Sequence, residues 1–485
     1  MKEQIKIVQS YQLILNGVKN TITIVVKEEE PVPNYHVTIS NISETTKIIL
    51  DKLRDEFVSR VDTLTTKENY EGDIVKEIFK KEIINLIGKY FPKADDPTKD
   101  MFTNYLISQH LGFGTIEILL IDPGLEEIVI NNAAEFVWVY HKKHGWLKTN
   151  VIINKESKIR HYATIIGREI NKEITLLNPL MDASLPSGDR VNATLHPIST
   201  KGNTITIRKF ATVPWTVTDF IKSGTISYET AAFIWMAIQY EMSVLVAGGT
   251  GSGKTSALNV LSCFLPPNRR IISIEDTREL VLASNLHWVP METRLANPEG
   301  KGGVSMLDLL VNSLRMRPDR ILVGEIRRKE EAQVLLEAMH TGHSVYATMH
   351  ANNAEEVAMR LTNPPIDIPK AMLTSVNIVL VQSRNRRTGK RRTFQLAEFD
   401  SQGDYSVFMQ YNMQKDTMEN IAEPKTLYKT LKTNAGLSNA DIQKDIDQKI
   451  KILKVLVDKN INNVDAIGAI MAKYYLGTLD ISKIK

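Results

Sequence analysis

The apolar positions of the chain first form strand-like runs and then take helical spacing. Two β-rich runs, YQLILNGV and NTITIVVK, open the sequence, and Asn16 with Gly17 forms a candidate turn between them. Residues 42–90 favour helices, because charged residues are mixed among the apolar ones, and residues 101–210 mix helices with strands. A helix is expected over about 158–170. These patterns predict α+β structure in this part of the chain.

From residue 228 onward, apolar strands alternate with helices. The strands read SVLVAG, RRIISIED, RILVGE and SVYATMH, and the helices between them include VSMLDLLVNSLRM and KEEAQVLLEAM. Such alternation predicts an α/β fold in which helices cover both faces of a mainly parallel sheet. Ligands of such sheets bind beyond the carboxyl ends of the strands, so the residues that follow each strand are the candidates for chemistry.

Segments rich in turn residues separate these stretches. FPKADDPTKD at 91–100 is interpreted as a linker, and the proline-bearing segment at 211–227 as a hinge. After residue 400 the chain is mainly helical, and Ser438 with Asp441 resembles a capping box that begins an amphipathic helix. The predicted regions are a variable N-terminal region (1–99), an α+β domain (100–212), a hinge (213–227), an α/β core (228–400) and a helical C-terminal region (401–485).

Composition narrows the function only a little. The 485 residues suit three or four folding units, and the net charge of +4 gives no argument for nucleic acid as a partner. Cys263 is the single cysteine, which excludes a disulfide within the chain and a multi-cysteine zinc site. The first residues have no long apolar core, so we expect no signal peptide, and no apolar run is long enough to span a bilayer. We therefore expect a cytoplasmic protein whose membrane role is peripheral, at the inner face of the cell membrane.

Residues 248–255 read GGTGSGKT, which matches the P-loop pattern between an apolar strand and a helix. The glycines let backbone N–H groups turn toward phosphate oxygens at a helix N-terminus, whose dipole favours anions. Lys254 would reach the β- and γ-phosphates, and the Thr255 hydroxyl would bind Mg²⁺. The residues predicted to bind nucleotide are Gly248, Gly249, Thr250, Gly251, Ser252, Gly253, Lys254, Thr255 and Ser256.

Carboxylates stand at the ends of two other apolar strands. RILVGEIR carries Glu325, where a Walker B acid would orient Mg²⁺ or its water shell. IISIEDTREL carries Glu275, which could orient the attacking water or accept its proton. Asp276 and Glu279 are alternatives for that role, and Asp276 could instead cap a helix.

Two histidines flank the strand in TGHSVYATMH, with His343 before it and His350 at its end. A zinc site is disfavoured, because no third or fourth ligand stands at metal-site spacing. One alternative is an ordinary polar strand end. The other is a γ-phosphate sensor formed by Thr348 and His350, since a histidine can donate a hydrogen bond to phosphate and release it after hydrolysis.

Hydrolysis of a triphosphate is helped by arginine charge at the γ-phosphate, which is worth about 10³–10⁵ in rate. The candidates, each of which could equally form a surface ion pair, are Arg190, Arg208, Arg315, Arg317, Arg320 and Arg327. RNRRTGKRR at 384–392 predicts a hairpin turn at Thr388 and Gly389 with cations around it. That hairpin is either a solvated turn or a surface attracted to anionic lipid or an acidic partner.

Taken together, four segments resemble the sequence boxes of the secretion ATPase superfamily. GGTGSGKT, SIEDTREL, LRMRPDRILVGEIR and TGHSVYATMH are similar to its Walker A, Asp box, Walker B and His box in order, spacing and strand context. IDPGLEEIVIN, LPSGDRVNATL and TITIRKF resemble its N-terminal domain, so the resemblance covers about residues 100–400. PWTVTDFI, EDTRELVL and VQSRNRRTGKRR look most similar to the archaeal pilus and archaellum motors of this family.

The resemblance implies a RecA-like P-loop NTPase domain with a smaller α+β domain before it and a helical tail after it. It implies a hexamer that binds ATP and Mg²⁺ between these two domains, with Thr255 and Glu325 at the metal. It makes Glu275 the catalytic glutamate. The further residues to which it gives a role are Lys254 at the phosphates and two His-box residues, His343 for nucleotide binding and His350 for catalysis. It also gives a catalytic role to Arg190 and Arg208, in the arginine-bearing segments of the N-terminal domain.

The partners that the resemblance implies are a polytopic membrane platform protein and a pilin-like or archaellin filament, which makes the chain a motor for assembly, secretion or rotation. Alternatives are a pilus retraction ATPase, a conjugation-type transfer ATPase that shares the four boxes, and a scaffold that binds nucleotide without hydrolysing it. The presence of both Glu275 and Glu325 disfavours the scaffold. The single cysteine disfavours the bacterial assembly ATPases that carry a tetracysteine zinc module.

Overall fold

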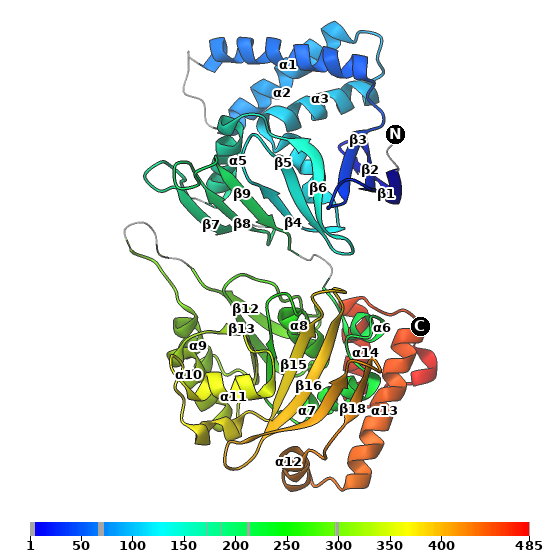
Figure 1. The fold of residues 1–485 in the computed structure, drawn as a ribbon, viewed down its shortest axis with the longest axis vertical. Helices are drawn as coiled ribbons and strands as arrows, with labels where there is room; N and C mark the ends of the chain where they lie inside the picture. Colours follow the sequence, from blue (N-terminus) through cyan, green and yellow to red (C-terminus); the bar gives the residue numbers. More distant parts are fainter. Residues whose placement is uncertain are drawn as a thin grey trace. The chain divides into compact units, whose positions relative to one another are not determined.

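The structure, a computed structural model, describes residues 5–65, 72–170, 172–185, 187–210, 214–294, 296 and 300–484. The chain forms two compact units, residues 1–211 and residues 212–485 (Figure 1). Each unit is built on a nine-stranded sheet. The predicted fold class is confirmed: a smaller α+β unit precedes a unit whose sheet is mostly parallel and whose last elements are helices.

The first unit combines an antiparallel sheet with helices. Its strands are β1 (Ile5–Leu15), β2 (Val18–Lys27), β3 (Asn34–Ile39), β4 (Leu125–Ile130), β5 (Phe136–His141), β6 (Gly145–Ile152), β7 (Leu180–Ser184), β8 (Arg190–Thr194) and β9 (Thr204–Arg208). Its helices are α1 (Glu44–Thr65), α2 (Gly72–Tyr90), α3 (Asp96–Leu111), η1 (Gly114–Ile116), α4 (Glu117–Ile121) and α5 (Glu156–Glu169). The strand order is β1-β2-β3-β6-β5-β4-β9-β8-β7, and only β3 and β6 pair in parallel.

Two hydrophobic cores hold this unit together. Helix α5 buries Ile159 and Ile166 against sheet residues such as Val139, and each fully buried aliphatic side chain contributes roughly 1.5–3 kcal/mol. A smaller core joins α1, α2 and α3. The predicted turn at Asn16 and Gly17 connects β1 to β2, and both residues have the positive φ (50° and 83°) that the turn requires.

The first predicted boundary differs from the structure. Residue 99 lies inside α3, and the Asp95 side chain accepts a hydrogen bond from the Thr98 N–H, so this segment caps a helix and is not a linker. Strands β1–β3 extend the same sheet as β4–β9, through the pairing of Tyr35 in β3 with Thr149 in β6. Residues 1–99 are therefore part of the first unit.

The second unit carries the predicted alternation of strands and helices. Its strands are β10 (Val244–Gly248), β11 (Arg270–Glu275), β12 (His287–Glu292), β13 (Arg320–Ile326), β14 (Ser344–Met349), β15 (Ile378–Arg384), β16 (Arg391–Phe399), β17 (Tyr405–Asn412) and β18 (Thr417–Asn420). Its helices are α6 (Val217–Lys222), α7 (Tyr228–Gln239), α8 (Lys254–Ser262), α9 (Met306–Leu314), α10 (Lys329–His340), α11 (Ala354–Thr362), η2 (Lys370–Ser375), α12 (Lys425–Ala435), α13 (Asn439–Asp458), α14 (Val464–Tyr475) and η3 (Ile481–Lys483).

The strand order of the second sheet is β12-β11-β13-β14-β10-β15-β16-β17-β18. The six strands from β12 to β15 are parallel, and β16, β17 and β18 continue the sheet in antiparallel fashion. Strand β10 lies among them and is buried on both faces, since Val244 and Val246 belong to one hydrophobic core and Leu245 and Ala247 to the other. Burial on both faces explains why this strand is apolar at every position.

The predicted hinge and tail also differ from the structure. Helix α6, inside the predicted hinge at 213–227, buries Val217 and Phe220 in the core of the second unit, and the Thr218 hydroxyl donates a hydrogen bond to the Ile461 carbonyl. Beyond residue 400, β17 and β18 continue the sheet before the helices begin. The amphipathic helix predicted after Ser438 is α13, and its apolar face packs into the same core.

No helix in the described part of the chain combines the length and the hydropathy needed to cross a bilayer.

Candidate functional site

The loop between β10 and α8 has the backbone geometry of a phosphate cradle. Gly251 and Gly253 have left-handed φ values of 71° and 93°, and Gly253 stands immediately before the first residue of α8. A Cβ on Gly248 would lie 2.3 Å from Ser252 Oγ and 2.7 Å from the Gln382 carbonyl oxygen, so a side chain is excluded there. The loop therefore presents backbone N–H groups at a helix N-terminus, which suits an anion.

Polar groups of this loop are held ready for a ligand. Among the described residues, the buried Ser252 Oγ has no hydrogen-bond partner, which is costly unless a ligand or water supplies one. Lys254 Nζ donates to the Gly249 carbonyl at 3.4 Å, a long bond that a phosphate oxygen can replace. Thr250 Oγ1 and His350 Nε2 are 2.9 Å apart. These observations fit a bound polyphosphate.

Glu275, at the carboxyl end of β11, is 2% exposed. Its Oε1 accepts hydrogen bonds from the backbone N–H groups of Glu279 (2.9 Å) and Leu280 (3.1 Å), whereas its Oε2 has no partner in the described structure. Burial raises the pKa of Glu275 from 4.5 to about 7, because desolvation outweighs the two backbone hydrogen bonds. A carboxyl group with this pKa can take up a proton near neutral pH.

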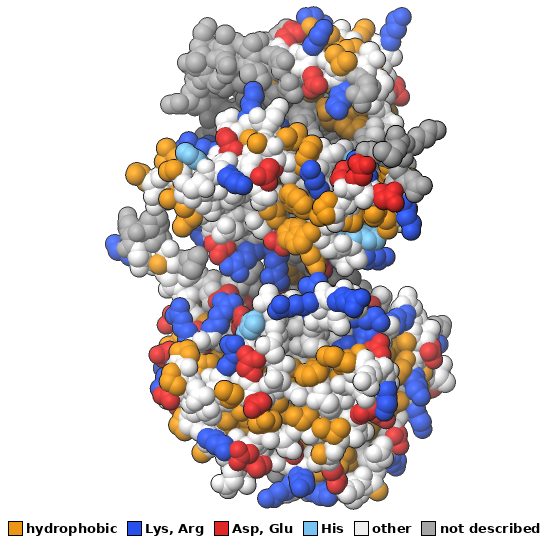
Figure 2. Space-filling view, viewed as in Figure 1, with side chains coloured by type: hydrophobic (Ala, Val, Ile, Leu, Met, Phe, Trp, Pro, Cys, Tyr) orange, Lys and Arg blue, Asp and Glu red, His pale blue; other side chains and the backbone are white. Residues whose placement is uncertain are grey.

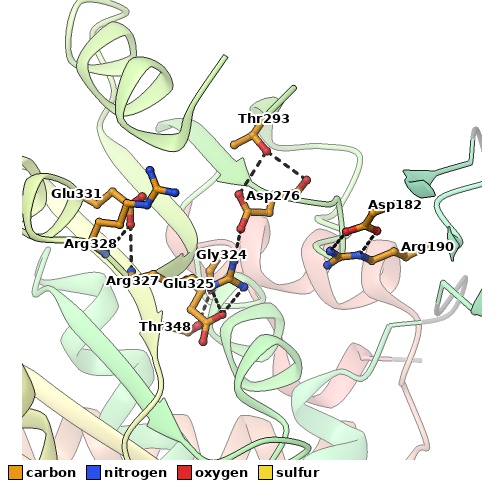
Figure 3. Close-up of polar contacts among 10 residues, drawn as sticks. All are labelled: Asp182, Arg190, Asp276, Thr293, Gly324, Glu325, Arg327, Arg328, Glu331 and Thr348. Atoms are coloured by element: carbon orange, nitrogen blue, oxygen red, sulfur yellow. Dashed lines mark hydrogen bonds and ion pairs between the residues drawn. The ribbon is translucent and has the colours of Figure 1, made fainter. Parts of the chain in front are cut away.

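Glu325, near the end of β13, lies in a cluster of charges with Asp276 and Arg327 (Figure 3). Arg327 Nε and Nη2 donate to Glu325 Oε2 at 2.9 and 2.7 Å, and Arg327 Nη1 donates to Asp276 Oδ2 at 2.7 Å. The guanidinium group thus bridges two carboxylates, as a metal cation would. Thr293 Oγ1 donates to Asp276, so Asp276 belongs to this cluster, and it caps no helix because the next described helix, α9, begins only at Met306.

The donor types suit Mg²⁺, which prefers oxygen ligands and keeps part of its water shell. The Thr255 hydroxyl lies in the first turn of α8, and the Glu325 carboxylate is available on a nearby strand of the same sheet. The unpartnered oxygen of Glu275 and the carboxylate of Asp276 are further acceptors for metal-bound water.

The two histidines lie at opposite ends of β14. His350 follows the carboxyl end and contacts the loop through Thr250, whereas His343 precedes the amino end and hydrogen-bonds with Thr341 and Ala338. A six-residue strand separates them, which is roughly 20 Å at 3.3 Å per residue. The structure thus places His343, which the resemblance makes a nucleotide-binding residue, at the opposite edge of the sheet from the P-loop. Thr348 Oγ1 donates to the Gly324 carbonyl and so joins β14 to β13 (Figure 3).

The candidate arginines fall into three groups. Arg327 lies in the carboxylate cluster described above. Arg320 begins β13 at the amino edge of the sheet, where it is 2% exposed and hydrogen-bonds with Glu241, and Arg315 and Arg317 directly precede that strand. These three lie at the amino edge of the sheet, opposite the carboxyl edge from which the P-loop emerges. The remaining two, Arg190 and Arg208, belong to the first unit.

Arg190 begins β8 and Arg208 ends β9, and the antiparallel register places them opposite each other. Arg190 makes a two-pronged ion pair with Asp182 of β7, in which Nε–Oδ1 is 3.0 Å and Nη2–Oδ2 is 2.6 Å (Figure 3). This pairing holds the pKa of the Asp182 carboxyl below its usual range. The structure thus brings the two predicted arginines of the first unit together on neighbouring strands.

Sequence reasoning missed part of the loop's surroundings. The hairpin turn predicted at Thr388 and Gly389 joins β15 to β16, and it brings Arg384 and Arg391 beside the P-loop. Asn352 also reaches it, since a Cβ on Gly249 would lie 2.9 Å from Asn352 Oδ1. The available signal was that the basic run follows the apolar strand NIVLVQS, but its neighbour in the sheet could not be read from the sequence.

The comparison with known families agrees with this geometry. The profile of the family described as "Type II/IV secretion system protein" matches residues 109–449. The chain belongs to this family. The match begins in the first unit and includes the P-loop, all three carboxylates of the site and both basic strands, so it covers every element described above in the second unit except the end of α13 and the residues that follow.

Individual relatives align with much of the chain. An uncharacterized protein of Methanocaldococcus jannaschii is 35% identical over 371 residues, which cover 73% of this chain and 66% of that protein. A second uncharacterized protein of this organism is 38% identical over 355 residues, which cover 65% and 48%. The type IV secretion system protein PtlH of Bordetella pertussis is 34% identical over 307 residues, which cover 55% and 88%. The chain thus spans only part of the length of the two M. jannaschii relatives.

Proposed function

We propose that the chain is a Mg²⁺-dependent ATPase that hydrolyses ATP to ADP and phosphate. The observation that carries the proposal is the shared edge of one sheet, where a glycine loop with Lys254 meets the strand-end carboxylates Glu275 and Glu325. Secretion-system ATPases are the family to which the chain belongs, and this supports hydrolysis over nucleotide binding alone.

Each residue of the site has a separate proposed role in the reaction. Lys254 and the loop N–H groups would hold the phosphates, and the Thr255 hydroxyl with Glu325 would hold Mg²⁺, which when bound would neutralise charge on the phosphate oxygens. Glu275 orients the attacking water and accepts its proton on the free Oε2. His350, in contact with Thr250, donates a hydrogen bond to the terminal phosphate. Arg327 occupies Glu325 Oε2, so Oε1 is the oxygen that would serve the metal.

Beyond hydrolysis, we propose a hexameric motor that works on a type IV pilus-like or archaellum filament through a membrane platform protein. Arg190 and Arg208 are the proposed source of cationic charge from the first unit. The filament role is supported by PWTVTDFI, EDTRELVL and VQSRNRRTGKRR, which look similar to archaeal pilus and archaellum motors. Opening and closing of the two units during the ATP cycle would convert hydrolysis into displacement.

A conjugation-type transfer ATPase is the second candidate. Its support is the similarity to a "Putative conjugal transfer protein" of Mycobacterium tuberculosis, which is 31% identical over 300 residues. Retraction of a pilus is a third candidate for the same motor, because the P-loop does not distinguish extension from retraction.

The test is phosphate release by the purified chain in Mg²⁺ and in EDTA. We expect release only with Mg²⁺, and no release in either condition contradicts the ATPase. Vesicles of phosphatidylglycerol and double-stranded DNA are then added separately. Stimulation by the vesicles supports the membrane-bound filament motor, whereas stimulation by DNA alone contradicts it and favours the transfer ATPase.

A further inference from the structure

Two arginines face each other on the strands that follow the P-loop strand in the sheet. Arg384 is the last residue of β15, Arg391 is the first residue of β16, and the antiparallel register pairs them directly. Like charges placed opposite each other on neighbouring strands destabilise a sheet. Strand β15 also pairs in parallel with β10, so this arginine pair lies at the sheet edge from which the P-loop emerges.

Both side chains reach the middle of the loop. Arg391 Nε donates to the Gly251 carbonyl at 3.0 Å, and a Cβ on Gly253 would lie 3.4 Å from Arg391 Cδ. A Cβ on Gly251 would lie 3.1 Å from Arg384 Nη1. The arginines therefore lie against the part of the loop whose backbone cradles phosphates. Figure 2 shows Lys and Arg side chains gathered at the edge of the second unit where β15 and β16 meet.

The next arginine on β16 shows that this arrangement is specific. Arg392 points to the other face of the strand and makes a two-pronged ion pair with Asp416, at 2.7 Å (Nε–Oδ1) and 3.0 Å (Nη2–Oδ2). Its charge is thus balanced within the protein, and Tyr411 adds a further hydrogen bond to the same carboxylate. Arg391 is directed instead to a backbone carbonyl, which balances no charge.

We infer that Arg384 and Arg391 bind the phosphates that ADP and ATP share, from the β15–β16 side of the loop. The inference rests on the proposed function, in which this loop binds a nucleotide. A guanidinium group binds a phosphate through two parallel hydrogen bonds that are roughly twice as strong as neutral ones, so Arg391 can exchange the Gly251 carbonyl for a phosphate oxygen. In the proposed function Glu325 and His350 would serve the γ-phosphate, and both follow strands on the opposite side of β10, so the arginine pair is assigned to binding and not to cleavage.

The experiment is calorimetric titration of ADP into the full chain and into the variants Arg384→Gln and Arg391→Gln. The matched control is Arg387→Gln, because Arg387 lies on the exposed tip of the same hairpin. Loss of one charge-assisted hydrogen bond corresponds to at least about tenfold weaker binding. We expect this loss for both site variants and a change of less than about twofold for the control.

A second readout separates binding from general damage. Turnover is also measured over a series of ATP concentrations up to saturation. Each site variant should keep kcat within about threefold of the unaltered chain while KM for ATP rises about tenfold, because the residues act on phosphates common to substrate and product. A fall in kcat with unchanged KM overturns the inference. Arg391→Lys, which keeps the charge but not the two-pronged contact, should bind ADP with intermediate affinity, and it decides the matter if Arg391→Gln does not fold.

The outcomes also distinguish the two proposals. If the unaltered chain does not bind ADP, the proposed function fails. If the unaltered chain binds ADP and both site variants bind it as tightly as the Arg387→Gln control, the proposed function stands and the inference about the arginine pair is wrong.

Discussion

The P-loop strand β10 divides the second sheet into two flanks with opposite chemistry. On one flank, β14, β13 and β11 end in a histidine and two glutamates; on the other, β15 and β16 meet in a pair of arginines. All of these groups stand at one edge, because the strands from β11 to β15 run in parallel. The comparison teaches that strand order alone separates the groups proposed to cut a terminal phosphate from those proposed to hold the remaining ones.

The flanks also differ in solvation. Glu275 is buried and carries an unpartnered oxygen, so its protonation responds strongly to its surroundings. The arginines belong to a hairpin whose tip is exposed, so salt screens their attraction for anions. The acidic flank should therefore determine how turnover depends on pH, and the basic flank how nucleotide binding depends on salt.

The largest effect on the acidic flank is expected for Glu275→Gln. Loss of the proton acceptor should lower kcat by about 10²–10⁴-fold while ADP binding is kept. Phosphate release and ADP titration on the same preparation measure both quantities. Glu279→Gln is the matched control, since it keeps the backbone N–H that donates to Glu275 Oε1; an equal loss of kcat in this control would make Glu279 the active acid.

The pH dependence of turnover should follow Glu275. Because its pKa is raised to about 7 and the base must be ionised, kcat should fall about tenfold per pH unit below 7 and level off above it. A kcat that does not change across pH 5–8 would contradict the role of Glu275 as the catalytic base.

The stability of the fold should also depend on the protonation of Glu275. The folded chain keeps the Glu275 proton between pH 4.5 and about 7, where the unfolded chain has lost it. The stability that this proton contributes is therefore complete below pH 4.5 and declines as the pH rises. Glu275→Gln should therefore unfold at a higher temperature than the unaltered chain at pH 8.

A smaller effect should separate the two histidines. His350→Ala removes a group that contacts Thr250 of the loop, and we expect roughly tenfold slower turnover for the loss of one hydrogen bond to a charged group. His343→Ala acts at the opposite edge of the sheet and should leave kcat within about twofold. Steady-state phosphate release at saturating ATP measures both, and equal losses would mean that position along β14 does not matter.

The smallest effect is expected for Asp416→Asn, on the outer face of the basic flank. This change weakens the ion pair with Arg392. The Asp416 side chain is 45% exposed, so solvent screens the pair and it contributes little to the free energy of unfolding. The midpoint of thermal unfolding should fall by about 2 °C or less, and KM for ATP should not change. A tenfold rise in KM would show that the basic flank acts as one charged surface and not through Arg384 and Arg391.

Local patterns carried most of what could be predicted from the sequence. The P-loop, the two strand-end glutamates and His350 each follow an apolar strand, and parallel pairing brings such positions to one edge whatever the strand order. The cap at Ser438 was likewise readable, because its partner Asp441 is only three residues away.

The features that the sequence did not reveal depend on long-range packing. The place of β15 beside β10 decides that the basic hairpin reaches the P-loop, and no local signal reveals that neighbour. The buried face of α6 inside the expected hinge depends on residues near 461. His343 was grouped with His350 because both lie in one motif, although a strand separates them.

The central claim is that the loop around Lys254 holds a triphosphate whose terminal bond is cut with help from the acidic flank. The most direct test is phosphate release and nucleotide binding measured together for the unaltered chain and for Lys254→Ala. The account predicts Mg²⁺-dependent release by the unaltered chain and loss of at least about 10²-fold in the variant, as for removal of one preorganised donor. Undiminished phosphate release from Lys254→Ala would contradict it.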